Sequence, residues 1–534
     1  MVDWSSNLPG VAAVRYVTDV AQIFSDVVRR HPGRPALVWS PAQATTYQRL
    51  DQVSNQMARL LLARGVRKRD PICICLEKQL VTYACILACL KVGLPYFFVD
   101  PANPKARTRT MIDRCRPVLA FVAPSADVDV FDCPAMAVDE RGAPSLLESL
   151  SAEPVTLDWS IDGSDPAYIM FTSGSTGTPK GVTISQSNLV NFIFWSQDQF
   201  GTTPADVFTN LNPLFFDNSV FDIYGSLFAG ASLVPFTAAT LRDPQAIVAR
   251  IEALECTVYF SVPSLLVYLQ TMKLLTPGAV PSLKKIIFGG EGYPKPMLAK
   301  LFQALGDRAA LYNVYGPTEC TCICSVYRVG AADFADMTGY APLGRLIANF
   351  SHVIVDEHEA WVAPGGIGEL CLGGPCVGLG YYADPALSAS VFVQNPTHRD
   401  FYDRVYKTGD FVRVDPGDGQ IYFVGRADTQ IKHQGYRIEL GEIEHALACV
   451  DGVDEAAAVY LSDGTRGRIV GIVASRCNLA PATVKKALLE TLPRFMVPEK
   501  VVVVAGLPKN PNGKIDRKAI TATLEDAEAV RWPT

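Results

Sequence analysis

A glycine- and hydroxyl-rich loop between two apolar runs constrains this chain more than any other feature. Residues 171–181 hold three glycines, five Ser or Thr side chains and Lys180. Glycines permit tight turns, and exposed N–H groups beside hydroxyls and a lysine make an anion site. Apolar residues 168–171 precede the loop and residues 182–184 follow it, which predicts strand, loop and strand rather than a flexible tether. Gly181 follows the lysine, so the loop is not a Walker A motif, but it suits a polyphosphate.

Length and composition exclude several classes of protein. At 534 residues the chain exceeds one ordinary core, so at least two domains are expected. A net charge of −6 argues against a nucleic-acid binder that works by bulk charge. We expect no signal peptide and no membrane span, because the N-terminus has no basic region and no apolar run is long enough. Fourteen scattered cysteines then favour a reducing cytoplasm and free thiols.

One cysteine cluster needs a separate interpretation. Cys320, Cys322 and Cys324 alternate, and on a strand all three would lie on one face. Structural zinc usually uses C-x₂-C pairs and four ligands, and neither a second pair nor a histidine spacing of that kind is present. We therefore expect small packing side chains in a strand and no metal.

Alternating helical and strand-like runs predict a doubly wound α/β architecture. In the first 150 residues, helices are expected at 17–30, 46–62 and 80–92, and strands at 36–39, 71–75 and 95–99. Further strands are expected at 233–236, 258–261 and 285–288, with helices between them.

The pattern changes after about residue 340. Short strands at 353–355, 360–362, 368–372, 411–414 and 421–424, separated by turns, predict a small antiparallel barrel or meander. The tail is long enough for a small α+β domain, with helices at 441–450 and 481–492 and strands at 455–461 and 469–474.

A second lysine lies in a distinctive frame near the end of the chain. Two prolines and a glycine fix a turn at 507–516, and Lys514 follows the glycine. Taken alone, Lys514 could be one more solvated lysine on a loop.

Together, the two loops resemble those of the adenylate-forming enzymes, and most of all amino-acid adenylation domains of nonribosomal peptide synthesis and D-alanine–carrier-protein ligases. The resemblance covers nearly the whole chain. Its other motifs, in order, are LKVG at 90–93, VDP at 99–101, FDNSV at 216–220, NVYGPTE at 313–319, GEL at 368–370, YKTGD at 406–410, GRAD at 425–428, Lys432, Gly435 and RIELGE at 437–442. It implies a large N-terminal domain at 1–424, a hinge at 425–428 and a smaller mobile C-terminal domain at 429–534.

The resemblance also implies roles for individual residues, with ATP and Mg²⁺ as cofactors. The β- and γ-phosphates would be held by Thr172, Ser173, Ser175, Thr176 and Lys180. Thr318 would contact the α-phosphate, Glu319 would bind Mg²⁺, Tyr315 would stack on adenine, and Asp410 with Arg426 would hold the ribose. Lys514 would bridge the substrate carboxylate and the α-phosphate. After rotation about Asp428, the segment around Gly435 would line a pantetheine channel instead.

Asp217 is the sharpest indication of substrate class. Amino-acid-activating relatives use a carboxylate there to pair with the substrate ammonium, a charge that is costly to bury alone. The pocket positions matched to the family are Asp217, Asn218, Phe221, Ser261, Ile287, Gly289, Val314, Cys322 and Ile323. They hold no second charge, so we expect a small or medium, neutral amino acid, with α or β placement of the amino group open.

The sequence constrains the acceptor of the activated aminoacyl group less than it constrains the substrate. With no carrier domain adjoining, we expect transfer to the phosphopantetheine thiol of a separate carrier protein. Arg466 and Arg468 could form a docking surface for an acidic carrier, although a solvated loop explains them equally well. A CoA ligase for a small amino or carboxylic acid, and a non-catalytic nucleotide or adenylate binder, are the alternatives.

Overall fold

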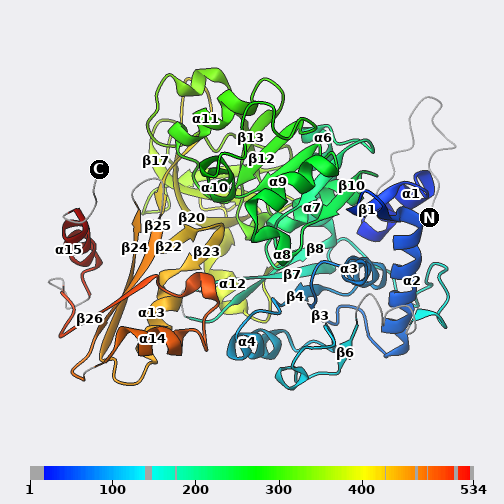
Figure 1. The fold of residues 1–534 in the computed structure, drawn as a ribbon, viewed down its shortest axis with the longest axis horizontal. Coiled ribbons are helices and arrows are strands. Elements are labelled where there is room, and N and C mark those ends of the chain that lie inside the picture. The colour runs from blue at the N-terminus through cyan, green and yellow to red at the C-terminus, as the bar shows by residue number, and fades with distance from the viewer. Residues whose placement is uncertain are drawn as a thin grey trace.

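Two large sheets form the framework of the N-terminal part (Figure 1). The computed structural model describes residues 17–138, 147–174, 177–426, 429–462, 467–477, 479–509 and 515–529. In spatial order, the first sheet among these residues contains β15 (Arg345–Leu346), β14 (Ser325–Arg328), β13 (Ala310–Tyr315), β12 (Lys285–Gly289), β11 (Val258–Ser261), β9 (Val207–Asn210), β10 (Ser232–Pro235), β1 (Pro35–Ser40) and β2 (Gln43–Thr46). From β13 to β1 every pair is parallel.

The second sheet carries the glycine-rich loop. Its strands, in spatial order, are β18 (Gly380–Tyr381), β8 (Lys180–Ser185), β7 (Pro166–Thr172), β4 (Tyr96–Phe98), β3 (Ile72–Cys75), β5 (Leu119–Val122) and β6 (Ala135–Ala137). Strands β7 and β8 are antiparallel, with Thr172 opposite Lys180. The predicted strand–loop–strand arrangement is therefore confirmed.

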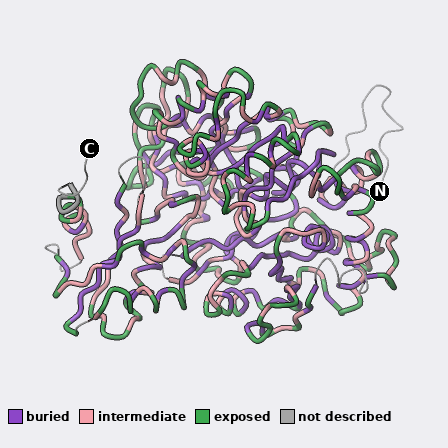
Figure 2. Tube along the Cα trace, viewed as in Figure 1, coloured by how far each residue is buried: buried purple, intermediate pink, exposed green. Residues whose placement is uncertain are grey.

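Helices cover both faces of these sheets. The helices of this part are α1 (Val20–Arg30), which precedes β1, and then α2 (Tyr47–Ala63), α3 (Leu80–Val92), α4 (Lys105–Cys115), α6 (Gln186–Phe200), α7 (Asn218–Leu227), α8 (Ala238–Leu241), α9 (Pro244–Ala253), α10 (Pro263–Thr271) and α11 (Lys295–Leu305). Apolar residues of α2, α3, α6 and α7 pack in one core between the two sheets, and those of α9, α10 and α11 pack on the outer face of the first. Figure 2 shows this buried centre and an exposed periphery. The doubly wound prediction is confirmed.

A third, antiparallel sheet follows. It contains β16 (Ser351–Val355), β17 (Ile367–Gly373), β20 (Arg404–Val414) and β19 (Phe392–Gln394), and β21 (Ile421–Arg426) pairs with β20. The helix α12 (Pro385–Val391) precedes β19. The strand expected at 360–362 is wrong, because only a single bridge joins Trp361 to Val355.

The chain from residue 430 onward forms smaller sheets with their own apolar clusters. The hairpin of β22 (Gln430–His433) and β23 (Tyr436–Glu439) leads into α13 (Leu440–Ala448). The three-stranded sheet has β24 (Glu455–Ser462), β25 (Gly467–Ala474) and β26 (Lys500–Val504), with α14 (Pro481–Leu488) and α15 (Arg517–Ala529) beside it. The smaller α+β domain is confirmed, and β26 and α15 were missed.

The cysteine segment differs from the sequence prediction. The 3₁₀ turn η3 (Thr318–Cys320) is followed by Thr321 and Cys322 with φ of 61° and 74°, so the strand expected there is wrong. Left-handed residues cannot continue a pleated ladder. All three thiols are buried. Among the described residues, no three or more His, Cys, Asp or Glu side chains are placed so that they could hold a metal ion. None of the described helices has the length and apolar character needed to cross a bilayer.

Candidate active site

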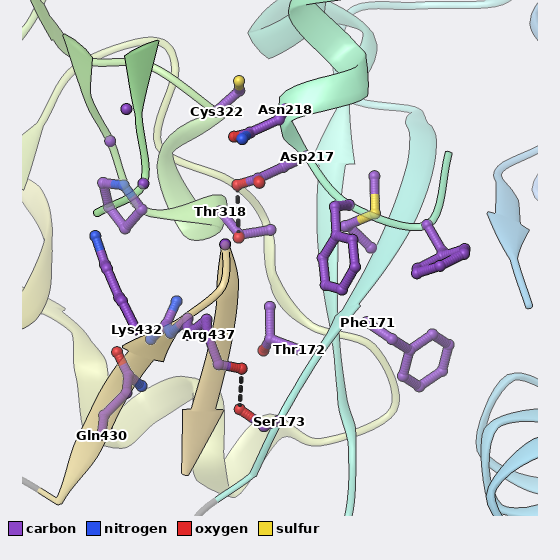
Figure 3. A pocket seen from close by; sticks show the side chains of 18 of the residues that line it. Phe171, Thr172, Ser173, Asp217, Asn218, Thr318, Cys322, Gln430, Lys432 and Arg437 are labelled. Atoms are coloured by element: carbon purple, nitrogen blue, oxygen red, sulfur yellow. Dashed lines mark hydrogen bonds between the residues drawn. The ribbon is translucent and has the colours of Figure 1, made fainter. Parts of the chain in front are cut away.

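One pocket lies where the strand ends of both large sheets meet the β22–β23 hairpin (Figure 3). Open α/β sheets place ligand sites at the carboxyl ends of their strands. The N-terminal wall comes from the ends of β7, β12 and β13 and from the start of α7, and the hairpin supplies Gln430, Lys432, Gly435 and Arg437. The pocket is thus shared between the two parts of the chain.

A tyrosine, a carboxylate and an arginine form a hydrogen-bonded group on one side of the pocket. The Tyr315 hydroxyl donates to Asp410 Oδ2 at 2.5 Å, and Arg426 Nη1 donates to Asp410 Oδ1 at 2.5 Å. Burial and the nearby Asp410 carboxylate raise the pKa of Tyr315 well above its usual value, so the hydroxyl remains a donor. Lys432 Nζ lies 5.7 Å from the Tyr315 ring centre, on the ring expected to stack on adenine. The sequence analysis expected Tyr315, Asp410 and Arg426 to hold one nucleoside, and it gave no role to Lys432.

Asp217 occupies the N-cap position of α7, but its side chain makes no capping hydrogen bond to the helix. Thr318 Oγ1 donates to Asp217 Oδ2 at 2.6 Å (Figure 3). Burial raises the pKa of Asp217, although the Thr318 hydroxyl and the more distant Arg437 charge favour the carboxylate. A raised pKa means that the surrounding cations do not fully compensate for desolvation. The pocket therefore offers a carboxylate that an added cation would stabilise.

Glu319 is completely buried beside the pocket. Tyr381 donates to Glu319 Oε1 at 2.8 Å, and Arg437 Nη1 donates to Glu319 Oε2 at 2.7 Å. Burial opposes ionisation, but the charges of Arg437 and Lys180 and these hydrogen bonds lower the pKa of Glu319 to about 2. Lys180 Nζ also lies 5.1 Å from the Tyr381 ring centre. Glu319 is therefore an ionised carboxylate in a cationic setting.

The described part of the glycine-rich loop faces the hairpin. Ser173 Oγ donates to the carbonyl of Arg437 at 2.8 Å and accepts from the Glu439 N–H at 3.2 Å. The Gly174 N–H donates to Glu442 Oε2 at 3.3 Å. A Cβ on Gly174 would lie 2.0 Å from the Thr178 carbonyl oxygen, so this close turn requires glycine.

The structure gathers part of the predicted residue set around the pocket. Those that line it are Thr172, Ser173, Asp217, Asn218, Gly289, Val314, Tyr315, Thr318, Cys322, Ile323, Asp410, Arg426 and Gly435. Ser175, Thr176, Asp428, Arg466 and Lys514 lie outside the described residues.

Three predicted substrate residues lie behind the pocket lining. Phe221 is fully buried, and its ring centre lies 5.2 Å from that of Phe260, which does line the pocket. Ser261 Oγ and the Tyr259 hydroxyl are hydrogen-bonded at 2.8 Å. Ile287 is fully buried in the core between the sheets. These side chains support the wall and do not reach the cavity.

Several lining residues carried no prediction. Lys432 and Arg437 are a cross-strand pair of the hairpin, so both side chains lie on one face. Tyr436 stacks on Phe495 with ring centres 3.7 Å apart, and Phe216 lies 5.1 Å from Tyr436. Lys432 lies two positions before Gln434, and Arg437 lies two positions after Gly435, the two residues of the hairpin turn. This equal spacing was the sequence signal for the cationic pair.

Two family models match this chain. A family model described as AMP-binding enzyme matches residues 24–382, and one described as AMP-binding enzyme C-terminal domain matches residues 442–514. The chain is 34% identical over 524 residues to the L-proline--[L-prolyl-carrier protein] ligase of Streptomyces coelicolor, covering 94% of this chain and 96% of that protein. It is 33% identical over 502 residues to tyrocidine synthase 2 of Brevibacillus parabrevis, covering 94% of this chain but only 14% of that much longer protein.

Solved structures agree with the sequence comparisons. Holo-PA1221, described as an NRPS protein containing adenylation and PCP domains, superimposes with a TM-score of 0.82 at 25% identity, covering 94% of this chain and 84% of the other. IdnL1 superimposes with a TM-score of 0.79 at 26% identity, covering 92% of this chain and all of the other.

Proposed function

Because the chain belongs to the family of AMP-binding enzymes, which are adenylate-forming ligases, we propose that it activates an amino acid with ATP as the aminoacyl-AMP. It then transfers the aminoacyl group to the phosphopantetheine thiol of a carrier protein. The relative named as an L-prolyl-carrier protein ligase, which matches over nearly its whole length, supports this acceptor.

The observation that carries the proposal is the placement of Asp217. Its carboxylate lies on the pocket wall, holds a hydrogen bond from Thr318 and has a pKa raised by burial. An ammonium group beside it would form a charge-assisted pair and remove the uncompensated desolvation. Acids without an amino group would leave that carboxylate unpaired, so we propose an amino acid as the substrate.

The rest of the lining favours an uncharged side chain. Asn218 and Cys322 line the pocket (Figure 3), together with Val314, Ile323 and Gly289. A Cβ on Gly289 would lie 2.3 Å from the Val314 carbonyl oxygen, so this wall tolerates no added atom. A small or medium, neutral amino acid fits this mixture of apolar and weakly polar groups.

The nucleotide is proposed to bind along the remaining walls. Tyr315, Asp410 and Arg426 would hold the adenosine, and the phosphate-binding set is Thr172, Ser173, Ser175, Thr176, Lys180 and Thr318. Glu319 suits a magnesium ion held mostly by phosphate oxygens and water, because it is ionised and provides hard oxygen ligands. When bound, that ion would neutralise charge on the phosphates. In the arrangement seen here, Arg437 donates to Oε2 of Glu319.

Two arrangements of the C-terminal domain are proposed to serve the two reactions. In the arrangement seen here, Gly435 reaches the pocket and its N–H donates to Glu291 Oε1. This fits transfer to a pantetheine thiol, whereas adenylation needs Lys514. We place the parts at 1–424 and 429–534, with Asp428 as the hinge. Rotation between reactions would let one site serve both.

Gly435→Ala is expected to slow thioester formation about tenfold while leaving adenylation nearly unchanged. An added Cβ would lie 2.8 Å from Val262 Cγ1, so it would oppose docking of the hairpin. Gly452→Ala is the matched control, since φ is 86° there against 85° at Gly435 but nothing lies closer than 4.0 Å. Single-turnover transfer from preformed aminoacyl-AMP measures the effect. Equal slowing by both variants would contradict it.

The apparent affinity for the amino acid is expected to fall as pH falls. Burial raises the pKa of Asp217, so this carboxylate is protonated at a higher pH than an ordinary aspartate. Protonation removes the partner of the ammonium, and KM for the amino acid rises below that pKa while KM for ATP is much less affected. The measurement is a pH series of both KM values, and parallel changes in the two would argue against this role.

The experiment that tests the function is exchange of labelled pyrophosphate into ATP over a panel of α- and β-amino acids. The expected result is exchange with one or a few small or medium, neutral members. Absence of pyrophosphate exchange with every amino acid would overturn the proposal in favour of a non-catalytic binder. Exchange only with acids that lack an amino group would contradict the role of Asp217.

A carrier protein is expected to be loaded far faster than CoA. Carrier surface and pantetheine arm together raise the effective concentration of the thiol, which free CoA cannot match. Transfer to phosphopantetheinylated carriers and to CoA is compared with the amino acid found in the exchange screen. CoA turnover equal to or above that of every carrier would support a CoA ligase instead.

A further inference from the structure

Thr318 belongs to two binding sites that the proposed function assigns separately. Its hydroxyl donates to Asp217 Oδ2 at 2.6 Å, and Asp217 is the proposed partner of the substrate ammonium (Figure 3). The same hydroxyl is the proposed contact of the α-phosphate. Both side chains line one pocket, so the amino acid and the nucleotide would meet at Thr318.

A threonine hydroxyl has one hydrogen to donate. In this structure that hydrogen goes to Asp217, and a separation of 2.6 Å is typical of a hydroxyl that donates to a charged oxygen. A phosphate oxygen is a second acceptor for the same hydrogen. Thr318 can therefore donate fully to the carboxylate or to the phosphate, but not to both.

The Asp217 carboxylate depends strongly on this hydrogen bond. Asp217 makes no capping hydrogen bond to α7, and among the residues that the structure describes no group other than Thr318 donates to its side chain. Burial raises the pKa of Asp217, and the hydrogen bond from Thr318 is the largest influence that opposes this rise. Withdrawal of the hydroxyl would leave a buried acceptor without a donor, which is unfavourable.

We infer that Thr318 transfers its hydrogen bond from Asp217 to the α-phosphate when the substrate ammonium pairs with Asp217, so that amino acid and nucleotide strengthen each other's binding. The inference rests on the proposed function, which places the ammonium at Asp217 and the phosphate at Thr318. Without an ammonium, a nucleotide that draws Thr318 away leaves the carboxylate unpaired. With an ammonium in place that penalty is absent, and because linkage is reciprocal the amino acid gains as much as the nucleotide.

The nucleotide thereby contributes to substrate selection. An acid without an amino group leaves Asp217 unpaired once Thr318 donates to the phosphate, so its disadvantage grows when the nucleotide is bound. The preference for an amino acid over the matching acid without an amino group is expected to be larger with the α-phosphate present than in its absence.

Calorimetry with unreactive ligand pairs tests the coupling. The probe is the amino alcohol that corresponds to the amino acid found in the exchange screen, because it keeps the ammonium and lacks the carboxylate that reacts. Saturating AMP is expected to tighten binding of this probe to the wild type about tenfold, whereas adenosine, which lacks the phosphate, leaves it unchanged. The matching alcohol without the amino group should gain nothing from AMP. Equal effects of AMP and adenosine on the amino alcohol would overturn the inference.

Variants of Thr318 separate its hydroxyl from direct attraction between the ammonium and the phosphate. Thr318→Val is expected to reduce the gain to about twofold, the part left to direct attraction, whereas Thr318→Ser keeps the hydroxyl and the full gain. Thr408→Val is the matched control, since Thr408 is another buried threonine of the pocket but donates to the Leu370 carbonyl. It should keep the tenfold gain. A tenfold gain in Thr318→Val as well would overturn the inference.

The gain is a ratio of two affinities measured on the same protein, so a purely structural loss of affinity cancels from it. The comparison of AMP with adenosine uses the wild type alone and decides the inference even where a variant fails to fold. Failure of the proposed function would appear separately, as wild-type protein that exchanges no pyrophosphate into ATP with any amino acid.

Discussion

Asp217→Ala is expected to abolish amino-acid-dependent exchange of pyrophosphate into ATP while ATP still binds. Removing one member of a buried charged pair costs about 3–5 kcal/mol, which corresponds to a loss of at least two orders of magnitude in kcat/KM for the amino acid. The nucleotide would contact other residues, chiefly Tyr315, Asp410 and Arg426. Pyrophosphate-exchange kinetics measure kcat/KM for the amino acid, and calorimetry with a non-hydrolysable ATP analogue measures nucleotide binding.

Two companion variants separate charge from structure. Asp217→Asn keeps an oxygen that can accept from Thr318 but has no charge, so it should be nearly as inactive as Asp217→Ala. Asp243→Ala removes an exposed aspartate that caps α9, and it should lower stability slightly without affecting exchange. An Asp217→Asn variant that activates the preferred amino acid normally would show that no ammonium is bound there.

Local patterns were sufficient for the elements that frame the site. The apolar runs around the glycine-rich loop became β7 and β8, and the helix expected at 80–92 has the bounds of α3. Thr46 accepts from the Arg49 N–H at the start of α2. Each of these features depends on residues close in sequence, where periodicity and capping are informative.

Features set by distant contacts could not be predicted in the same way. Arg437 and Glu319 are 118 positions apart, and Glu442 and Gly174 are 268 apart. The motifs gave Glu319 a role as the magnesium ligand but gave none to Arg437 or Glu442, and their order did not reveal that these two side chains meet the Glu319 carboxylate and the Gly174 N–H. The alternation at Cys320–Cys324 was misleading because the left-handed conformations of Thr321 and Cys322 follow from the turn out of β13, which a period of two does not detect.

Lys514→Ala is expected to block adenylate formation and to spare transfer from supplied aminoacyl-AMP. The described residues on either side of this lysine, Lys509 and Ile515, form a bridge with each other and are not part of the pocket lining seen here. Instead, Lys509 pairs with Glu455, and Ile515 packs against the apolar cluster of Leu507 and Ile520. The hairpin thus reaches the pocket in this arrangement, whereas neither Lys509 nor Ile515 lines it.

The expected loss in the first reaction is large, on the order of 100- to 1000-fold, because a lysine between two anions stabilises charge at the moment of attack. Lys509→Ala is the matched control from the same segment, and its partly exposed pair with Glu455 should matter little. Pyrophosphate exchange measures the first reaction, and single-turnover thioester formation from supplied aminoacyl-AMP measures the second. If Lys514→Ala slowed both equally, the two reactions could not belong to separate arrangements of the C-terminal domain, and Lys514 would have to act in each.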